Sequence, residues 1–149
     1  MQPIKEKTMK KLTITATVAA FSLAFSAAAL ADSQSKAEFK AEKNSIQAEY
    51  KSAKAVCDQF KGNAKDICVA EAKGKENVSL SELEARYHPS PKANYNVLIA
   101  KAQADYSVAQ QKCDDLSGNV KDVCVKEAKA ALSAAKADAQ AQMKTANAN

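Results

Sequence analysis

The residues whose spacing most directly suggests chemistry are four cysteines. They bracket two similar segments, "CDQFKGNAKDIC" from Cys57 to Cys68 and "CDDLSGNVKDVC" from Cys113 to Cys124. A cysteine pair can form a disulfide, bind a metal ion or exchange electrons with another thiol. Each segment has a Gly-Asn dipeptide at its centre, which predicts that the chain reverses direction between the two cysteines.

The first segment predicts two antiparallel helices that are joined at Gly62 and Asn63. Cys57 precedes Gly62 by five residues and Cys68 follows Asn63 by five, so each cysteine lies about a turn and a half from the corner. This symmetry places both thiols at the same height, where their Cα atoms can approach within the range of about 4.4–6.8 Å that disulfides require. Gly118 and Asn119 are expected to do the same in the second segment.

Four cysteines permit three pairings, and the symmetry of the two segments favours Cys57–Cys68 with Cys113–Cys124. Each bridge should stabilise the fold by about 3 kcal/mol in the chain-entropy model. A catalytic thiol–disulfide site normally has Cys-x-x-Cys spacing, which is missing here. Zinc would need four spaced Cys or His ligands, and the sole histidine, His88, lies beside a proline in a predicted loop. We therefore expect no metal and no cofactor.

The chain contains an internal duplication. At an offset of 56 residues, Tyr50–Lys73 and Tyr106–Lys129 are identical at 13 of 24 positions, including both cysteines and the Gly-Asn pair. Apolar residues with alternating spacings of three and four precede each glycine, which predicts one packing stripe for each copy. The first stripe is Phe39, Lys43, Ile46, Tyr50, Ala53, Cys57 and Phe60; the second is Tyr95, Ile99, Ala102, Tyr106, Ala109, Cys113 and Leu116.

Start and stop signals predict the helices of the first hairpin, residues 32–88. Ser35 and Glu38 have the spacing of a capping box, Gly62 suits the end of the first helix, and Asn63 with Asp66 suits the start of the second. Within the second helix, Gly74 and the polar "NVSLS" that follows predict a kink, with Ser79 and Glu82 as a possible restart.

The second hairpin is expected over residues 89–149. Tyr87-His88-Pro89 should end the preceding helix, and Ser90 followed by Pro91 is a favoured helix start. Gly118-Asn119 with Asp122 repeats the earlier turn, and the tail after Met143 should fray. The fold class is thus all-α, with four helices in two disulfide-stapled hairpins. Their mutual packing stays open between a compact bundle and an extended pair that is joined at His88-Pro89.

The N-terminal region has the pattern of a cleaved signal peptide. Lys10 and Lys11 precede an uncharged run over 12–31, and Ala29 and Ala31 then stand three residues and one residue before Asp32. Cleavage is expected after Ala31, with Ala29 as the lesser site. A retained anchor is the alternative, since the run has the length of a membrane span, but its Ser/Thr content and A-x-A ending favour cleavage. Met1 and Met9 are both candidate translation starts.

Charge and composition exclude several functional classes. The predicted leader holds four lysines and one glutamate, so its removal lowers the formal net charge from +5 to +2. This low charge argues against a nucleic-acid partner. In the mature segment alanine outnumbers Ile, Leu, Val and Phe together, which predicts slender, closely packed helices with a thin core. No phosphate loop or nucleophile–base set is evident in the sequence, so we expect no catalytic residues and no enzyme.

The quoted cysteine segments, with "ELEARY.PS" between them, resemble a group of small Ala/Lys-rich exported proteins of Gram-negative bacteria that carry this hairpin twice. The resemblance covers essentially the whole mature chain. It implies a periplasmic, all-helical protein.

These observations favour a non-enzymatic structural or interaction protein of the cell envelope. Its partner would be another envelope protein or a second copy, without nucleic acid and without a membrane anchor after cleavage. The first alternative is a stress-responsive periplasmic chaperone whose hairpins separate to expose Phe39, Phe60 and the tyrosines. Another is a thiol oxidoreductase, which would need accessible, readily reduced cysteines.

Overall fold

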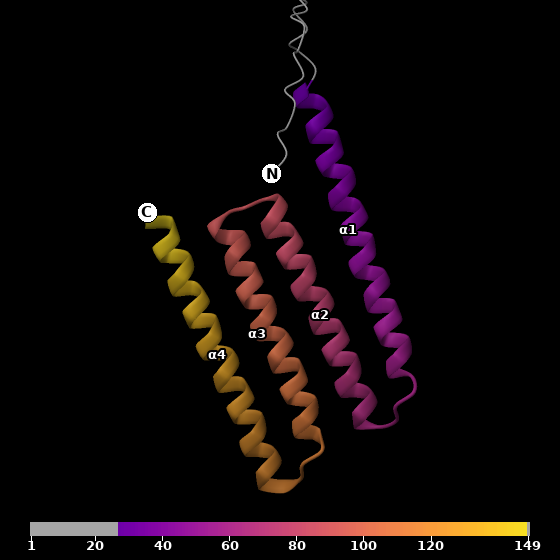
Figure 1. The fold of residues 1–149 in the computed structure, drawn as a ribbon. Helices are drawn as coiled ribbons and strands as arrows, with labels where there is room; N and C mark the ends of the chain where they lie inside the picture. Colours follow the sequence, from indigo (N-terminus) through magenta and orange to yellow (C-terminus); the bar gives the residue numbers. More distant parts are fainter. Residues whose placement is uncertain (1–26, 149) are drawn as a thin grey trace, which may run out of the picture.

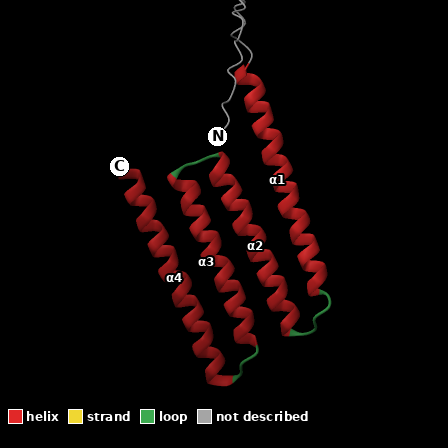
Figure 2. Ribbon diagram, viewed as in Figure 1, coloured by secondary structure: helices red, strands yellow, loops and turns green. Residues whose placement is uncertain are grey.

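The computed structural model describes the backbone of residues 27–148 and the side chains of residues 35–148. This part of the chain forms four α-helices and contains no strand (Figure 2). The helices are α1 (Ala27–Cys57), α2 (Asn63–Tyr87), α3 (Pro91–Asp114) and α4 (Gly118–Ala148). The predicted all-α class with two hairpins, α1–α2 and α3–α4, is confirmed.

Helix α1 begins earlier than the capping box predicted. Ser35 lies inside the helix, because the alanine-rich residues 27–31 are strong helix formers and extend it toward the N-terminus. The predicted leader spans residues 1–31, and its residues 1–26 lie outside the described part of the chain. Ala29, Ala31 and Asp32 lie on the described backbone of α1, and their side chains are outside the described part.

The connection of the first hairpin spans residues 58–62, and the connection of the second spans residues 115–117. Amides just after α1 donate to carbonyls three residues back, as Phe60 N does to Cys57 O at 3.0 Å, and this tightens the last turn before Gly62. Gly62 and Gly118 have φ values of 58° and 55°, which favour glycine. Asn63 is the first residue of α2 rather than its cap, since Gly62 occupies the cap position.

The second hairpin departs from the sequence prediction at both ends of α4. This helix begins at Gly118, so Asn119 lies inside it and Asp122 falls beyond its first turn. At the other end α4 continues to Ala148 instead of fraying after Met143, because the tail is rich in alanine. The turn between the hairpins agrees with the prediction. His88 is the C-cap of α2, Ser90 is the N-cap of α3 and accepts a hydrogen bond from Ala93 N at 3.0 Å, and Pro91 is the first residue of α3.

Helix α2 is continuous through the segment after Gly74 where the sequence predicts a kink, and Gly74 lies in close contact with α3. The helix runs without interruption from Asn63 to Tyr87. A β-carbon added to Gly74 would lie 2.8 Å from Cβ of Ala104, closer than real Cβ contacts. The absence of a side chain at Gly74 therefore lets α2 and α3 approach each other at mid-length.

The four helices form a single open row. Helix α1 contacts α2, α2 contacts α3 and α3 contacts α4, and no other pair of these described helices is in contact. Figure 1 shows the same order. The α1–α2 and α3–α4 connections lie at one end of the helices, called the disulfide end below, and the α2–α3 connection lies at the other end. The arrangement is thus neither a closed bundle nor two separated hairpins. Helices α1 and α4 each have one edge without a neighbour.

The core is thin and repeats between the hairpins. Leu83 of α2 and its equivalent in α4, Ala139, are both 1% exposed. The two stripes predicted from the sequence are largely half-buried or buried, with two kinds of exception. Lys43 is exposed, and its neighbour Glu42 is half-buried instead. Phe60 and Leu116, which end the stripes, are also exposed because they lie in the connections.

Candidate interaction surfaces

The disulfides are the predicted ones. Cys57 bonds to Cys68 with a Cα separation of 5.5 Å, and Cys113 bonds to Cys124 with a Cα separation of 5.7 Å. Cys57 and Cys113 are buried, and Cys68 and Cys124 are half-buried. The described part of the chain contains no free cysteine. Such bridges persist in an oxidising, extracellular type of environment, so the protein belongs to a compartment of that kind.

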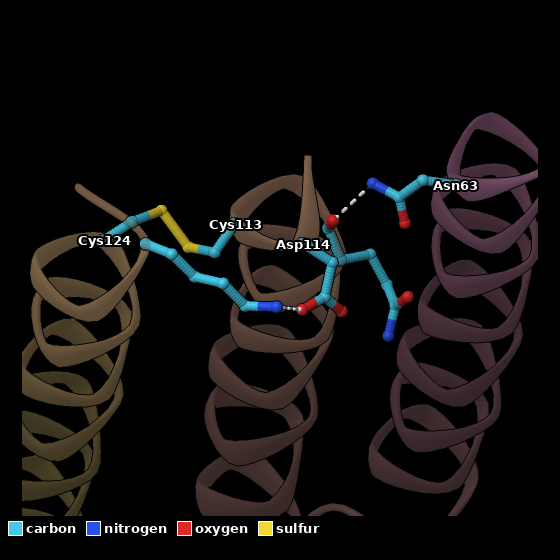
Figure 3. The surroundings of a disulfide bond; sticks show 6 residues. Asn63, Cys113, Asp114 and Cys124 are labelled. Carbon is cyan, nitrogen blue, oxygen red and sulfur yellow. Dashed lines mark hydrogen bonds and ion pairs between the residues drawn. A yellow bond between two sulfur atoms is a disulfide. The ribbon is translucent and has the colours of Figure 1, made fainter. Parts of the chain in front are cut away.

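An ion pair accompanies each disulfide at equivalent positions. Lys65 Nζ lies 2.8 Å from Asp58 Oδ1, and Lys121 Nζ lies 2.8 Å from Asp114 Oδ1 (Figure 3). The hydrogen bond from Lys65 lowers the pKa of the Asp58 carboxyl and raises the pKa of the Lys65 ammonium, with the Coulomb attraction as the second cause. Both pairs are solvent-exposed, so they tie the chain across the connection without adding much stability.

Asn63 links the two hairpins at the disulfide end. Its Nδ2 donates to the backbone oxygen of Gln111 at 2.7 Å, which brings α2 against α3 one turn from the second disulfide (Figure 3). The equivalent Asn119 lies at the start of α4, which has no following helix. Among residues 27–148 its exposed side chain has no hydrogen-bond partner. One asparagine of the repeat is therefore engaged between helices and the other is not.

Large apolar side chains are exposed at the disulfide end. Val120 and Val123, in the first two turns of α4, are 64% and 47% exposed. Their equivalents in α2 are Ala64, which is exposed, and Ile67, which is half-buried. The other exposed members of this end are Val56, Phe60 and Leu116. Sequence reasoning missed Val120 and Val123, because only the arrangement of the described helices shows that α4 contacts a single neighbour.

Two of the four tyrosines line a groove on one face of the row. Tyr50 and Tyr106, which are equivalent in the repeat, border an open hollow of about 720 Å³ that crosses all four helices. Lys73 also lines it, with Nζ 5.0 Å from the centroid of the Tyr50 ring and 2.7 Å from an oxygen of buried Glu76. The hydrogen bond to Glu76 raises the pKa of Lys73. The groove is wide and shallow, which suits a surface contact.

Tyr87, next to the central turn, joins α2 to α1. Tyr87 donates a hydrogen bond to Glu42 Oε1 at 2.9 Å, and this bond is the main cause of the raised pKa of its phenol. Arg86 pairs with the other oxygen of Glu42. Phe39 packs edge-on against the Tyr87 ring at 5.3 Å and lies 5.9 Å from the ring of exposed His88. These contacts hold α1 to the end of α2.

The described residues contain no cluster of metal-binding side chains and no helix that could span a membrane. No three His, Cys, Asp or Glu side chains within this part of the chain are placed to hold a metal ion. None of its helices combines the length and the apolar character needed to cross a bilayer.

The fold and the bonded cysteines together define a class: a duplicated helical-hairpin protein, stapled by one disulfide in each repeat and built as a single layer for an oxidising compartment. No protein-family model, curated protein or solved structure matches the chain.

Proposed function

We propose that the protein is a non-enzymatic structural or protein-interaction component of the bacterial periplasm, and that it binds other envelope proteins or further copies of itself through the edges and faces of its helical row. The predicted leader and the resemblance to small exported proteins support the periplasm. The disulfides fit this location, since the periplasm is oxidising.

The observation that carries the proposal is the open row itself. Most small helical proteins cover their apolar surfaces by closing the helices around one core. Here α1 and α4 each contact one neighbour, and Val120 and Val123 remain exposed on α4. Exposed apolar side chains that gather on one part of a surface commonly mark an interaction site.

Photo-crosslinking in living cells tests the proposal. A photoreactive amino acid replaces Val120 on α4, and a matched probe replaces Lys112, an exposed residue near the C-terminal end of the interior helix α3. We expect discrete crosslinked species from the Val120 probe and far fewer from the Lys112 probe. Absence of any crosslinked species at Val120, in cells that export the protein normally, would contradict the proposal.

A periplasmic chaperone is the second candidate, favoured by the exposed apolar side chains at the disulfide end of the helices. Phe60 and Leu116 stand there with the two valines of α4 and could hold unfolded segments. The purified protein should then suppress aggregation of an unfolded client near stoichiometric ratio, and Phe60→Ser should weaken this effect. Inertness at excess would eliminate the chaperone and leave the interaction role in place.

A further inference from the structure

The seam between α2 and α3 shows how one repeat joins the next. Along it Gly74 lies against Ala104, and Asn63 donates to the Gln111 carbonyl. Ala93 and Ala100 of α3 are each 7% exposed. The first repeat thus uses its second helix, α2, to receive the first helix of the second repeat, α3.

The free edge of α4 carries the equivalents of the receiving side. Asn119 corresponds to Asn63, Val123 to Ile67 and Ala130 to Gly74, at the offset of 56. All three α4 residues are exposed, and their helical spacing places them on one line along the side of α4 that faces away from α3. Small residues predominate along this edge, and at one end lies Asn119, whose side chain has no hydrogen-bond partner among the described residues.

The free edge of α1 carries the equivalents of the inserting side. Ala37, Asn44 and Ala48 correspond to Ala93, Ala100 and Ala104, and all three are exposed. Ala55 corresponds to Gln111. Because Gln111 accepts the bond from Asn63 through its backbone carbonyl, Ala55 has the same acceptor. The two uncovered edges of the chain are therefore the two halves of a seam that it already forms once internally.

We infer that the occupant of the α4 edge is the α1 edge of a second copy, docked so that the rows continue head to tail. This inference rests on the proposed interaction role and names the partner. Ala130 would face Ala48 of the second copy, and Asn119 would donate to its Ala55 carbonyl. Contacts of this kind do not close on themselves, so assembly continues beyond a dimer as concentration rises.

Two features make this contact weaker than the internal seam. Ala130 has the methyl group that Gly74 lacks, so the helices must stand further apart than α2 and α3 do. Lys126 and Lys51 are the equivalents of Ala70 and Ser107, which line the same groove beside the seam. The two lysines therefore repel each other across the contact, and salt should strengthen assembly by screening them.

Sedimentation velocity of the exported protein, at protein concentrations up to about 1 mM, tests the inference. Within the chain, the short turn between α2 and α3 gives the internal seam an effective concentration of about this size. We expect growth beyond a dimer. Lys51→Glu should raise the association constant roughly two- to fivefold, as an exposed ion pair would, whereas Lys43→Glu on the same helix should not. Ala130→Lys should lower it about tenfold or more, and Ala131→Lys, one residue along, should leave it unchanged.

A photoreactive amino acid at Ala48 supplies the second measurement. Crosslinks should map to residues near Ala130 of another copy. A monomer throughout the concentration range, or crosslinks that join α4 to α4, would overturn the inference. If that result were found while Val120 still crosslinked to other proteins in cells, only the head-to-tail inference would be contradicted. If the Val120 crosslinks were absent too, both the inference and the proposed function would be contradicted.

Discussion

Gly74 and Ala104 mark the closest approach of α2 and α3, where a single added β-carbon would come within 2.8 Å of the neighbouring one. We predict that Gly74→Ala lowers the free energy of unfolding by up to about 2 kcal/mol. Overpacking costs about 1–3 kcal/mol, and the gain of about 1 kcal/mol in helix propensity offsets part of it. Urea denaturation followed by circular dichroism measures the change.

The equivalent position supplies the control. Ala130 is exposed on α4, so Ala130→Gly should cost only the propensity term of about 1 kcal/mol. If Gly74→Ala instead stabilised the protein, glycine would not be there for close packing.

The disulfides and helices were predictable because their signals are local. Five residues on each side of Gly62-Asn63 place Cys57 opposite Cys68, and Ser90-Pro91 starts a helix by its own chemistry. The role of Gly74 was not predictable in this way, because its partner lies on another helix. Read locally, a glycine in a helix indicates a kink, and only the position of Ala104 shows that it permits contact.

The open row and its free edges were also beyond the sequence pattern. The repeat of Asn63 at Asn119 looked like two helix caps, yet the structure uses Asn63 between helices and leaves Asn119 exposed. The start of α1 was misplaced because Ser35 and Glu38 carry a good cap signal that the alanines before them override.

Asn63→Ala and Asn119→Ala form a matched pair. The first removes the hydrogen bond to the Gln111 carbonyl and should lower the free energy of unfolding by about 1 kcal/mol. The second removes no bond within the described chain and should change stability little at low concentration. Equal losses in thermal unfolding would show that both residues act as helix caps, contrary to this account.

Removal of the first disulfide in Cys57→Ala/Cys68→Ala should lower the free energy of unfolding by about 3 kcal/mol in the chain-entropy model. Because α1 contacts only α2, the loss should appear in hydrogen exchange mainly as faster exchange in α1. Cys113→Ala/Cys124→Ala should act in the same way on α4. Uniform acceleration across all four helices would contradict a row of separable neighbours.

The phenol of Tyr87 should titrate above its ordinary pKa of 10.0, because its proton is held in the bond to Glu42. A raised folded-state pKa means that this contribution to stability is complete below pH 10 and is lost as pH rises through the folded-state pKa. Tyrosinate absorbance of the wild type and Tyr87→Phe isolates the titration. Glu42→Gln should move the pKa back toward 10.0, and an unchanged value would contradict the assigned cause.

The distance between α1 and α4 tests the open row most directly. Spin labels attached through unnatural amino acids at Ser45 and Ser133, both exposed, can be measured by pulsed electron resonance in dilute solution without disturbing the disulfides. Neighbouring helix axes stand about 8–10 Å apart, so three spacings predict a separation of roughly 24–30 Å before the length of the labels is added. A single population near the neighbouring-helix distance of about 10 Å would instead show a closed bundle with α1 against α4.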